Sequence, residues 1–270
     1  LARIFVMPDV QRQTGKGYEL AKMPVPEIAE AAQKRVLWEQ QQQLLLRKEH
    51  GAGTTPVSAV ELLRMKDEKR IVILGAPGAG KTTLMNYWVV KATAAQARAD
   101  ASQGLTSEHV SVENGAPESV SMSEALFGTE HCFPVLIRIR DLVREPDLSV
   151  LEFLIKFAKA DLEVEEIPTD FFQHWLKRGE ALILLDGLDE VADDAQRHRV
   201  VEKIETFLGA YEGCPAIITS RPAGYRDDYF SRKQYPHYEL LPFDDEKIET
   251  FIDHWYDSRV DMQTERERRK

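Results

Sequence analysis

A glycine-rich segment contains the residues with the clearest chemical use in this chain. Residues 75–82 read G-x-x-x-x-G-K-T and directly follow the apolar run 71–74. The glycines let the backbone turn so that successive N–H groups point at phosphate oxygens, while Lys81 reaches the β- and γ-phosphates and the Thr82 hydroxyl binds magnesium. The alternative is a glycine-rich turn without a ligand, but the flanking strand and helix patterns favour a nucleoside triphosphate site. The predicted binding residues are Gly75, Ala76, Pro77, Gly78, Ala79, Gly80, Lys81, Thr82 and Thr83.

An acidic segment, DGLDE, follows a second apolar run at residues 182–185. Its first acid, Asp186, is expected at the carboxyl end of a strand, which is where open parallel sheets bind their ligands. We predict that Asp186 binds Mg²⁺ together with Thr82; the alternative is that it only caps the following turn. Asp189 and Glu190 come three and four residues later, and either can polarise the attacking water. The spacing alone does not decide between them.

A single arginine follows a third apolar run, in the segment IITSRPAGY at residues 217–225. A fixed guanidinium at a strand end can contact the γ-phosphate and so distinguish a triphosphate from a diphosphate. Arginines at strand ends also pair with carboxylates, which is the competing interpretation for Arg221. Taken with the two motifs before it, the segment favours the phosphate. The predicted catalytic residues are therefore Lys81, Asp186, Asp189, Glu190 and Arg221.

Apolar runs of strand length alternate with helical patterns along most of the chain. The pattern predicts strands at residues 70–74, 133–142, 181–186, 215–220 and 237–243, with helices at 81–98, 149–160, 170–178 and 194–208. Strands that alternate with helices form a parallel sheet with helices on both faces. The predicted fold class is therefore α/β, and the carboxyl ends of the strands would bring the three motifs to one edge of the sheet.

The chain before the glycine-rich loop is expected to divide into two parts. Residues 1–26 contain short apolar stretches broken by prolines and glycines, which indicates an extended N-terminal arm. Residues 27–67 are rich in helix formers, which indicates a helical linker. Within this linker, Ser58 and Glu61 have the spacing of a capping box and would begin a second helix.

Composition also marks the main domain and the segment after it. We assign residues 68–243 to a nucleotide-binding domain, with a flexible insertion at 100–132, where the chain is polar and rich in Ser, Glu and Gly. Residues 244–270 have the pattern of an amphipathic helix and would begin a helical domain. The chain starts with Leu and stops in a charged helical stretch, so we expect it to be a fragment of a longer protein.

Charge and composition exclude several classes of function. The 270 residues include 35 Lys and Arg against 45 Asp and Glu, a net charge of −10, so nucleic acid is not an expected partner. Cys132 and Cys214 are far apart in the sequence, which fits a reducing compartment such as the cytoplasm. No apolar run approaches the roughly 20 residues that cross a bilayer, so no membrane span is expected.

The motifs together resemble the NACHT family of signal-transduction ATPases, which belong to the STAND class. The segments that carry the resemblance occur in the family's order: GAPGAGKTT, FPVLIRIRDL, LILLDGLDEV and IITSRPAGY. The resemblance covers about residues 57–256 and extends to animal innate-immune receptors and bacterial anti-phage proteins alike. It implies a P-loop NTPase fold with a five-stranded parallel sheet in the order 5-1-4-3-2. This order would place the Arg221 strand between the Lys81 and Asp186 strands.

The resemblance also implies a function and its partners. The implied cofactors are ATP or ADP with Mg²⁺, and the lack of an N-K-x-D guanine motif favours adenine among the purines. ADP would hold a closed state, whereas ATP would favour an open state that forms homo-oligomers through the NACHT domain. The expected protein is a slow ATPase and signalling switch in immune or anti-phage defence, with sensor and effector domains outside this chain. The alternatives are an AAA+-like motor or chaperone, with Arg226 as a candidate arginine finger, and a nucleotide-stabilised scaffold without turnover.

Overall fold

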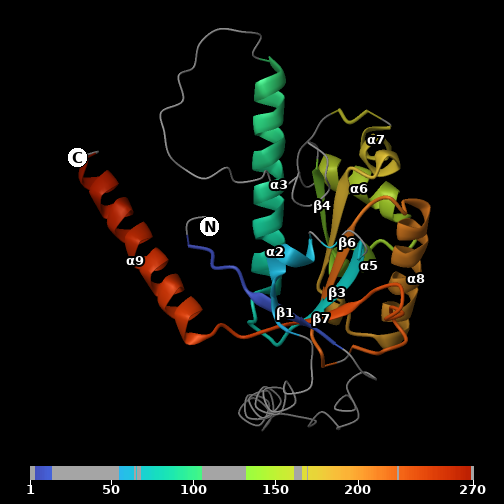
Figure 1. Cartoon of the computed structure of the whole chain (residues 1–270). Coiled ribbons are helices and arrows are strands. Elements are labelled where there is room, and N and C mark those ends of the chain that lie inside the picture. The colour runs from blue at the N-terminus through green and yellow to red at the C-terminus, as the bar shows by residue number, and fades with distance from the viewer. Residues whose placement is uncertain are drawn as a thin grey trace.

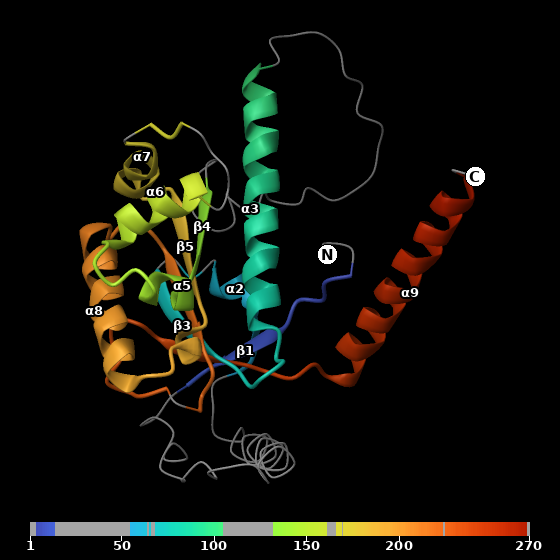
Figure 2. The same ribbon diagram turned by 180° about the vertical axis from the view of Figure 1, so that it is seen from behind.

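A seven-stranded sheet with helices on both faces organises the chain (Figures 1 and 2). The computed structural model describes residues 4–13, 55–63, 65, 68–104, 132–160, 166–168, 170–223 and 225–268. Most of the predicted helical linker (27–54) and of the predicted insertion (105–131) therefore lies outside the described residues.

Five parallel strands make up most of the sheet and confirm the predicted α/β class. They are β3 (Arg70–Leu74), β4 (Phe133–Arg138), β5 (Ala181–Asp186), β6 (Ala216–Ser220) and β7 (His237–Leu240). In space they follow the order β7-β3-β6-β5-β4, which is the predicted 5-1-4-3-2 order. The strand that leads to Arg221 therefore lies between the strands that lead to Lys81 and Asp186.

Two further strands extend this sheet, so the predicted count of five was wrong. The strand β1 (Asp9–Arg12) lies in the predicted arm and pairs antiparallel with β7. The strand β2 (Val57–Ser58) lies in the predicted linker and pairs antiparallel with β1. The sequence of β1 is DVQR, and its one apolar residue, Val10, is fully buried. A strand this short and polar gives no sequence signal of its own. It forms because the open edge of β7 offers unpaired backbone groups for hydrogen bonding.

The helices follow the predicted pattern with three corrections. Their bounds are α2 (Ala59–Leu62), α3 (Lys81–Gly104), α5 (Ile139–Val143), α6 (Val150–Ala160), α7 (Phe171–Arg178), η3 (Leu188–Glu190), α8 (Asp194–Ala210) and α9 (Asp245–Arg268). The helix predicted from Ser58 is only four residues long, and Ser58, its N-cap residue, makes no side-chain capping hydrogen bond. The predicted strand 133–142 ends at Arg138, since the buried Ile139 and Leu142 are three apart and belong to a helix. The start of the predicted insertion, residues 100–104, belongs to α3.

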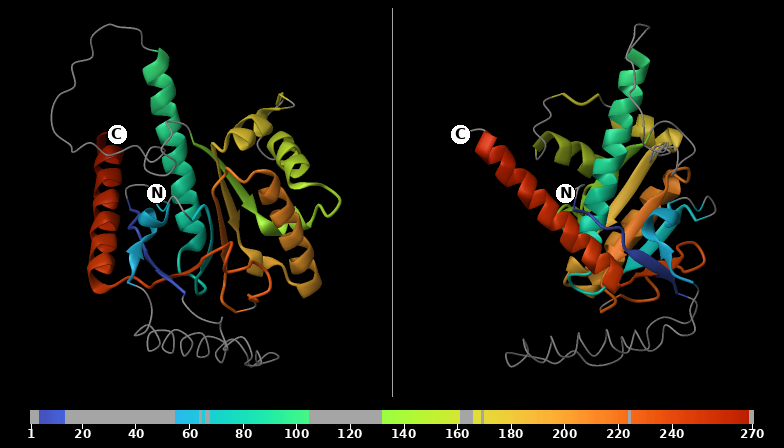
Figure 3. Two further views of the ribbon diagram at one scale, coloured as in Figure 1. Left: turned by 45° about the vertical axis from the view of Figure 1, so that its right-hand side comes forward. Right: turned by 60° about the vertical axis from the view of Figure 1, so that its left-hand side comes forward.

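The sheet separates two hydrophobic clusters, and alternate residues of one strand enter different clusters. Val72 and Leu74 of β3 pack with α6, α7 and α8, whereas Ile71 and Ile73 pack with α3 on the other face. This alternation is the period of two that a strand imposes on its side chains. Helix α9 stands apart from the sheet in the views of Figures 1–3. Its exposed apolar side chains include those of Ile248, Phe251, Ile252, Trp255 and Tyr256.

Two further sequence expectations concern the membrane and the cysteines. Among the helices of the described residues, none combines the length and the hydropathy that a bilayer span requires. Cys132 and Cys214 are both buried and free, so they form no disulfide.

A buried histidine joins β7 to the loop that follows Arg221. His237 is only 1% exposed, with Nδ1 2.6 Å from the Tyr235 carbonyl oxygen and Nε2 2.7 Å from the Tyr225 hydroxyl. Because a carbonyl oxygen only accepts, Nδ1–H donates to it, and the neutral ring accepts the Tyr225 hydroxyl proton at Nε2. Burial and the Arg232 charge lower the pKa of His237 from 6.5 to about 4.

This histidine is expected to make the fold less stable in mild acid. The unfolded chain binds a proton at His237 below pH 6.5, whereas the folded chain does so only near pH 4, so stability is lost as the pH falls through this window. The loss from this residue should reach roughly 3 kcal/mol at pH 4. Urea unfolding at pH 7 and pH 4 would measure it. A His237→Gln variant should show a smaller loss between the two pH values; an equal loss would contradict the assignment.

Candidate functional site

The glycine-rich loop joins β3 to α3 and forms an open cradle. Gly78 and Gly80 have φ values of +74° and +92°, and a Cβ added at either position would meet nothing within 4 Å. These positions therefore favour glycine because of their backbone conformation and not because of crowding. The Gly75 N–H donates to the Ser220 carbonyl at 3.1 Å, which ties the loop to β6. The N-terminus of the long helix α3 follows directly, and a helix N-terminus favours an anion.

Lys81, the first residue of α3, lies at the centre of the predicted residues. Its Nζ donates to the carbonyl oxygens of Gly75 at 2.7 Å and Ala76 at 3.1 Å, so the side chain folds back over the loop. Burial lowers the pKa of Lys81, and nearby charges act on it as well. These charges belong to Asp189, Arg221, Asp186 and Glu190. All five predicted catalytic side chains therefore gather at one place.

Asp186 connects the ends of three elements through two threonines. Its carboxylate, in a residue only 8% exposed, accepts hydrogen bonds from Thr82 Oγ1 at 2.7 Å and from Thr219 Oγ1 at 2.5 Å. Thr219 also accepts the Gly187 N–H at 3.0 Å. Because both carboxylate oxygens accept hydroxyl hydrogens from other elements, the interpretation of Asp186 as only a cap of the following turn is wrong. Thr219 was missed by the sequence analysis, although its position in TSR, just before Arg221, was visible.

The Thr82 hydroxyl oxygen and the Asp186 carboxylate also fit a magnesium ion. Mg²⁺ prefers hard oxygen ligands and is usually held by one or two protein groups, with phosphates and water completing its shell. Thr82 Oγ1 and the Asp186 carboxylate are such groups, and they already lie side by side. Within the described ranges, no group of three or more His, Cys, Asp or Glu side chains could hold a metal by itself. With two protein oxygens in place, the phosphates of a nucleotide and water would complete the shell of the ion.

Arg221 pairs with a carboxylate, as the competing interpretation of the sequence held. Its Nε lies 2.8 Å from Asp189 Oδ2, and its backbone N–H donates to Asp189 Oδ1 at 3.0 Å. The Asp189 side chain is only 10% exposed, whereas that of Arg221 is 40% exposed. A contact between Arg221 and the γ-phosphate stays a prediction, which the position of Arg221 near Lys81 allows.

Glu190 has a different cationic partner, which distinguishes it from Asp189. Its Oε2 lies 3.1 Å from Nη1 of Arg140, the second residue of α5. Asp189 and Glu190, whose roles the sequence spacing did not distinguish, therefore differ in their cationic partners. Arg140 was missed by the sequence analysis, because no motif links it to a residue 50 positions away.

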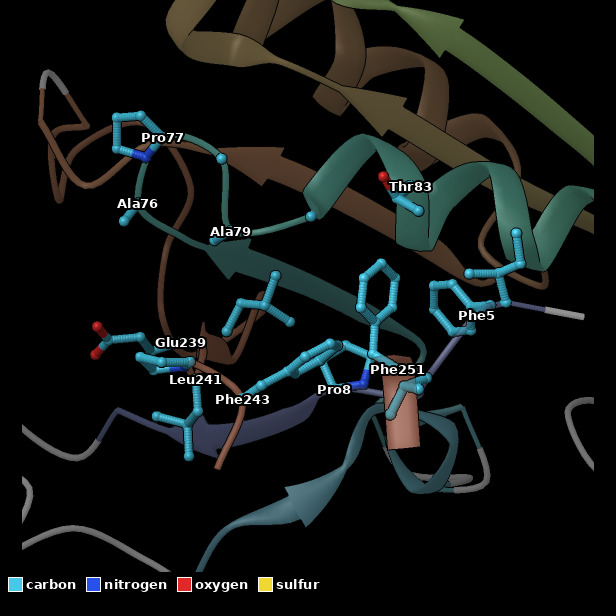
Figure 4. A pocket seen from close by; sticks show the side chains of 16 residues that line it. Phe5, Pro8, Ala76, Pro77, Ala79, Thr83, Glu239, Leu241, Phe243 and Phe251 are labelled. Atoms are coloured by element: carbon cyan, nitrogen blue, oxygen red, sulfur yellow. The ribbon is translucent and has the colours of Figure 1, made fainter. Parts of the chain in front are cut away.

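An apolar cavity of about 530 Å³ opens beside the glycine-rich loop (Figure 4). Loop residues 76–80 and Thr83 line one side. Phe5, Phe243 and Phe251 lie across from them, together with Pro8, and come from the N-terminal arm, the segment after β7 and α9 (Figure 4). The part played by the arm was not foreseen, since it depends on the pairing of β1 with β7.

Comparison with known proteins agrees with this geometry. A family model described as the NACHT domain matches residues 120–259, just over half of the chain. A search of the curated proteins finds no match. The matched range contains Asp186, Glu190 and Arg221 but begins after the glycine-rich loop. The loop is therefore an independent sign of nucleotide binding. The chain belongs to the NACHT family and is a P-loop, nucleotide-binding NTPase.

Proposed function

We propose that the chain is the nucleotide-binding part of a signalling switch that binds ATP and ADP with Mg²⁺ and hydrolyses ATP slowly. The observation that supports this most is the convergence of Asp186, Asp189, Glu190 and Arg221 on the Lys81 ammonium beside an open phosphate loop. Arg221, the residue expected to contact the γ-phosphate, is held in an ion pair with Asp189. Such a resting arrangement suits a switch that waits for a trigger better than a machine that cycles rapidly.

In the proposed mechanism each side chain has one task. Lys81 exchanges the carbonyls of Gly75 and Ala76 for the β- and γ-phosphates of ATP. Thr82 and Asp186 would hold the magnesium ion, which would supply charge stabilisation to the phosphates. Arg221 contacts the γ-phosphate through its terminal nitrogens, which make no hydrogen bond within the part of the chain that the structure describes.

We assign the water-activating role to Glu190 and not to Asp189. Asp189 has a side chain only 10% exposed, and each of its carboxylate oxygens already faces a nitrogen of Arg221, so little of the group is open to a water molecule. Glu190 has a side chain that is 40% exposed and can reach a water molecule. A general base must lie within hydrogen-bonding reach of the proton it removes. Asp189 instead holds Arg221 until a γ-phosphate competes for the guanidinium.

The wider proposal concerns signalling, and it rests on the family resemblance. We propose that ADP favours a closed state, and that ATP favours homo-oligomers formed through the NACHT domain in an immune or anti-phage pathway in the cytoplasm. Sensor and effector domains would lie outside this chain. The exposed apolar side chains of α9, from Ile248 to Tyr256, support the proposal that residues 244–270 begin a helical domain after the nucleotide-binding domain at 68–243.

The rate of phosphate release tests this function against its alternatives. Rapid cyclic release from Mg-ATP would favour a motor, slow release a switch, and no release a scaffold. The motor alternative needs an arginine offered to a neighbouring subunit. Its candidate, Arg226, instead pairs within the chain with Asp228 at 2.9 Å and Asp194 at 3.1 Å. Binding of neither ATP nor ADP to the purified chain would contradict the proposed function altogether.

The apolar cavity is the proposed site of the purine base and ribose. Its volume and aromatic lining are typical of small-molecule sites, and it adjoins the loop that would hold the phosphates. Because Phe251 lines this cavity, a Phe251→Ala change should weaken ATP affinity roughly fivefold, as loss of an aromatic contact does.

The neighbouring residue of α9 provides a matched control for this prediction. Ile252 has a similar exposure to Phe251 but does not line the cavity, so Ile252→Ala should leave the affinity unchanged. Titration with a fluorescent ATP analogue would compare the two variants. Equal effects from both changes would place the base elsewhere.

A further inference from the structure

We infer that Arg140 is a positioning residue that orients Glu190 for the activation of water. This inference rests on the proposed function, because it needs Glu190 to act as the base. Arg140 lies in α5, which begins where β4 ends, and β4 is paired with β5 so that Arg138 is opposite Asp186. The start of α5 is therefore held next to the acidic segment that follows β5.

The contact between α5 and η3 is fixed by packing and not only by charge. Ile139 and Leu142 of α5 and Leu188 of η3 are fully buried members of one hydrophobic cluster. Arg140 follows the buried Ile139, and Glu190 lies two residues after the buried Leu188. Both charged side chains therefore extend from backbone that is held by the core. A close-packed core of this kind keeps the two backbones at a set separation.

The Glu190 side chain is held from two sides. The backbone N–H of Glu190 donates to the Gly187 carbonyl at 3.1 Å, and the Glu190 side chain folds over Gly187 itself. A Cβ at Gly187, whose φ is +83°, would lie only 3.2 Å from Glu190 Cδ and 3.3 Å from Cγ. Glycine at this position thus leaves room for the carboxylate, and Arg140 Nη1 holds its outer oxygen at 3.1 Å.

The ion pair is placed to orient the carboxylate and not to stabilise the fold. The side chains of Arg140 and Glu190 are 45% and 40% exposed, and ion pairs with such exposure contribute little to stability. A carboxylate that is not held can rotate, and a misplaced catalytic group lowers the rate of the chemical step. Arg140 is itself steadied by Asp141, whose Oδ1 lies 3.8 Å from its Nε.

Three single variants of the purified chain test this inference with Mg-ATP. Arg140→Ala should lower kcat on the order of tenfold, with the affinity for ATP and the melting temperature unchanged. Arg140→Lys should recover part of the lost rate, because it keeps a cation beside Glu190. Arg144 pairs with Asp141 but not with Glu190, so Arg144→Ala should behave as the wild type.

A double variant distinguishes positioning from a general structural effect. In a Glu190→Gln background, Arg140→Ala should cause no further loss of kcat, since the group that it orients is gone. Wild-type kcat in Arg140→Ala, or the same fold loss in both backgrounds, would overturn the inference. If Glu190→Gln still lowers kcat in that case, the proposed function stands. If Glu190→Gln has no effect on kcat, the assignment of the base and the inference fail together.

Discussion

Replacing Lys81 with alanine is expected to weaken the affinity of the chain for Mg-ATP by about 100-fold and to remove measurable phosphate release. The ammonium is partly buried, and it already donates to two carbonyl oxygens at the point where the loop would face the phosphates. A charged hydrogen bond to a phosphate is stronger than one to a carbonyl, so ATP draws the side chain away from the loop. Equilibrium titration of the variant with ATP, ADP and AMP would measure the effect.

The pattern among the three nucleotides makes this prediction specific. Because Lys81 is expected at the β- and γ-phosphates, the loss should be large for ATP and small for AMP. Lys91 lies farther along the same helix, where its ammonium is 5.4 Å from the centre of the Tyr87 ring, so Lys91→Ala is a suitable control. Lys81→Ala variants that bind ATP as tightly as the wild type would show that the loop is not a phosphate site.

Elements that are buried on both faces could be predicted from the sequence almost to the residue. The strand β5, ALILLD, is buried at all six positions and consists of its apolar run and the aspartate that follows it. The order of the parallel strands came from the family resemblance, and the structure confirms it. The glycine-rich loop was predictable for a different reason, since phosphate binding demands particular residues at fixed spacing.

Features that depend on distant pairing could not be predicted. The strand β1 has one apolar residue and exists because β7, more than 200 residues later, offers it an edge. The partners of the two acids are equally remote in sequence: Arg221 lies 32 residues after Asp189, and Arg140 lies 50 residues before Glu190. Asp189 and Glu190 follow Asp186 by three and four residues, so their positions within DGLDE are almost equivalent. Only their tertiary contacts distinguish the two acids. Local patterns thus identified the acids, whereas their separate roles required the fold.

Asparagine in place of Asp186 is expected to lower phosphate release at saturating ATP on the order of 100- to 1,000-fold, which is the scale of stabilisation that a bound metal ion provides. The amide keeps the shape of the side chain, and the hydroxyls of Thr82 and Thr219 can rotate to meet it. The fold should therefore persist, while the negative charge that attracts the ion is lost. Nucleotide affinity of the wild type should fall when EDTA removes Mg²⁺, and the affinity of Asp186→Asn should be low with or without it.

A second aspartate offers a matched test of this reasoning. Asp193 caps α8 by accepting the Gln196 N–H at 2.8 Å, and asparagine caps a helix as well as aspartate does. Asp193→Asn therefore makes the same chemical change outside the site, and it should keep both the hydrolysis rate and its dependence on Mg²⁺. If Asp186→Asn still bound ATP more tightly in the presence of Mg²⁺, the ion would have to lie on other oxygens. The hydrogen bonds of Asp186 to the two threonines would then serve only to join the phosphate loop to the neighbouring strands.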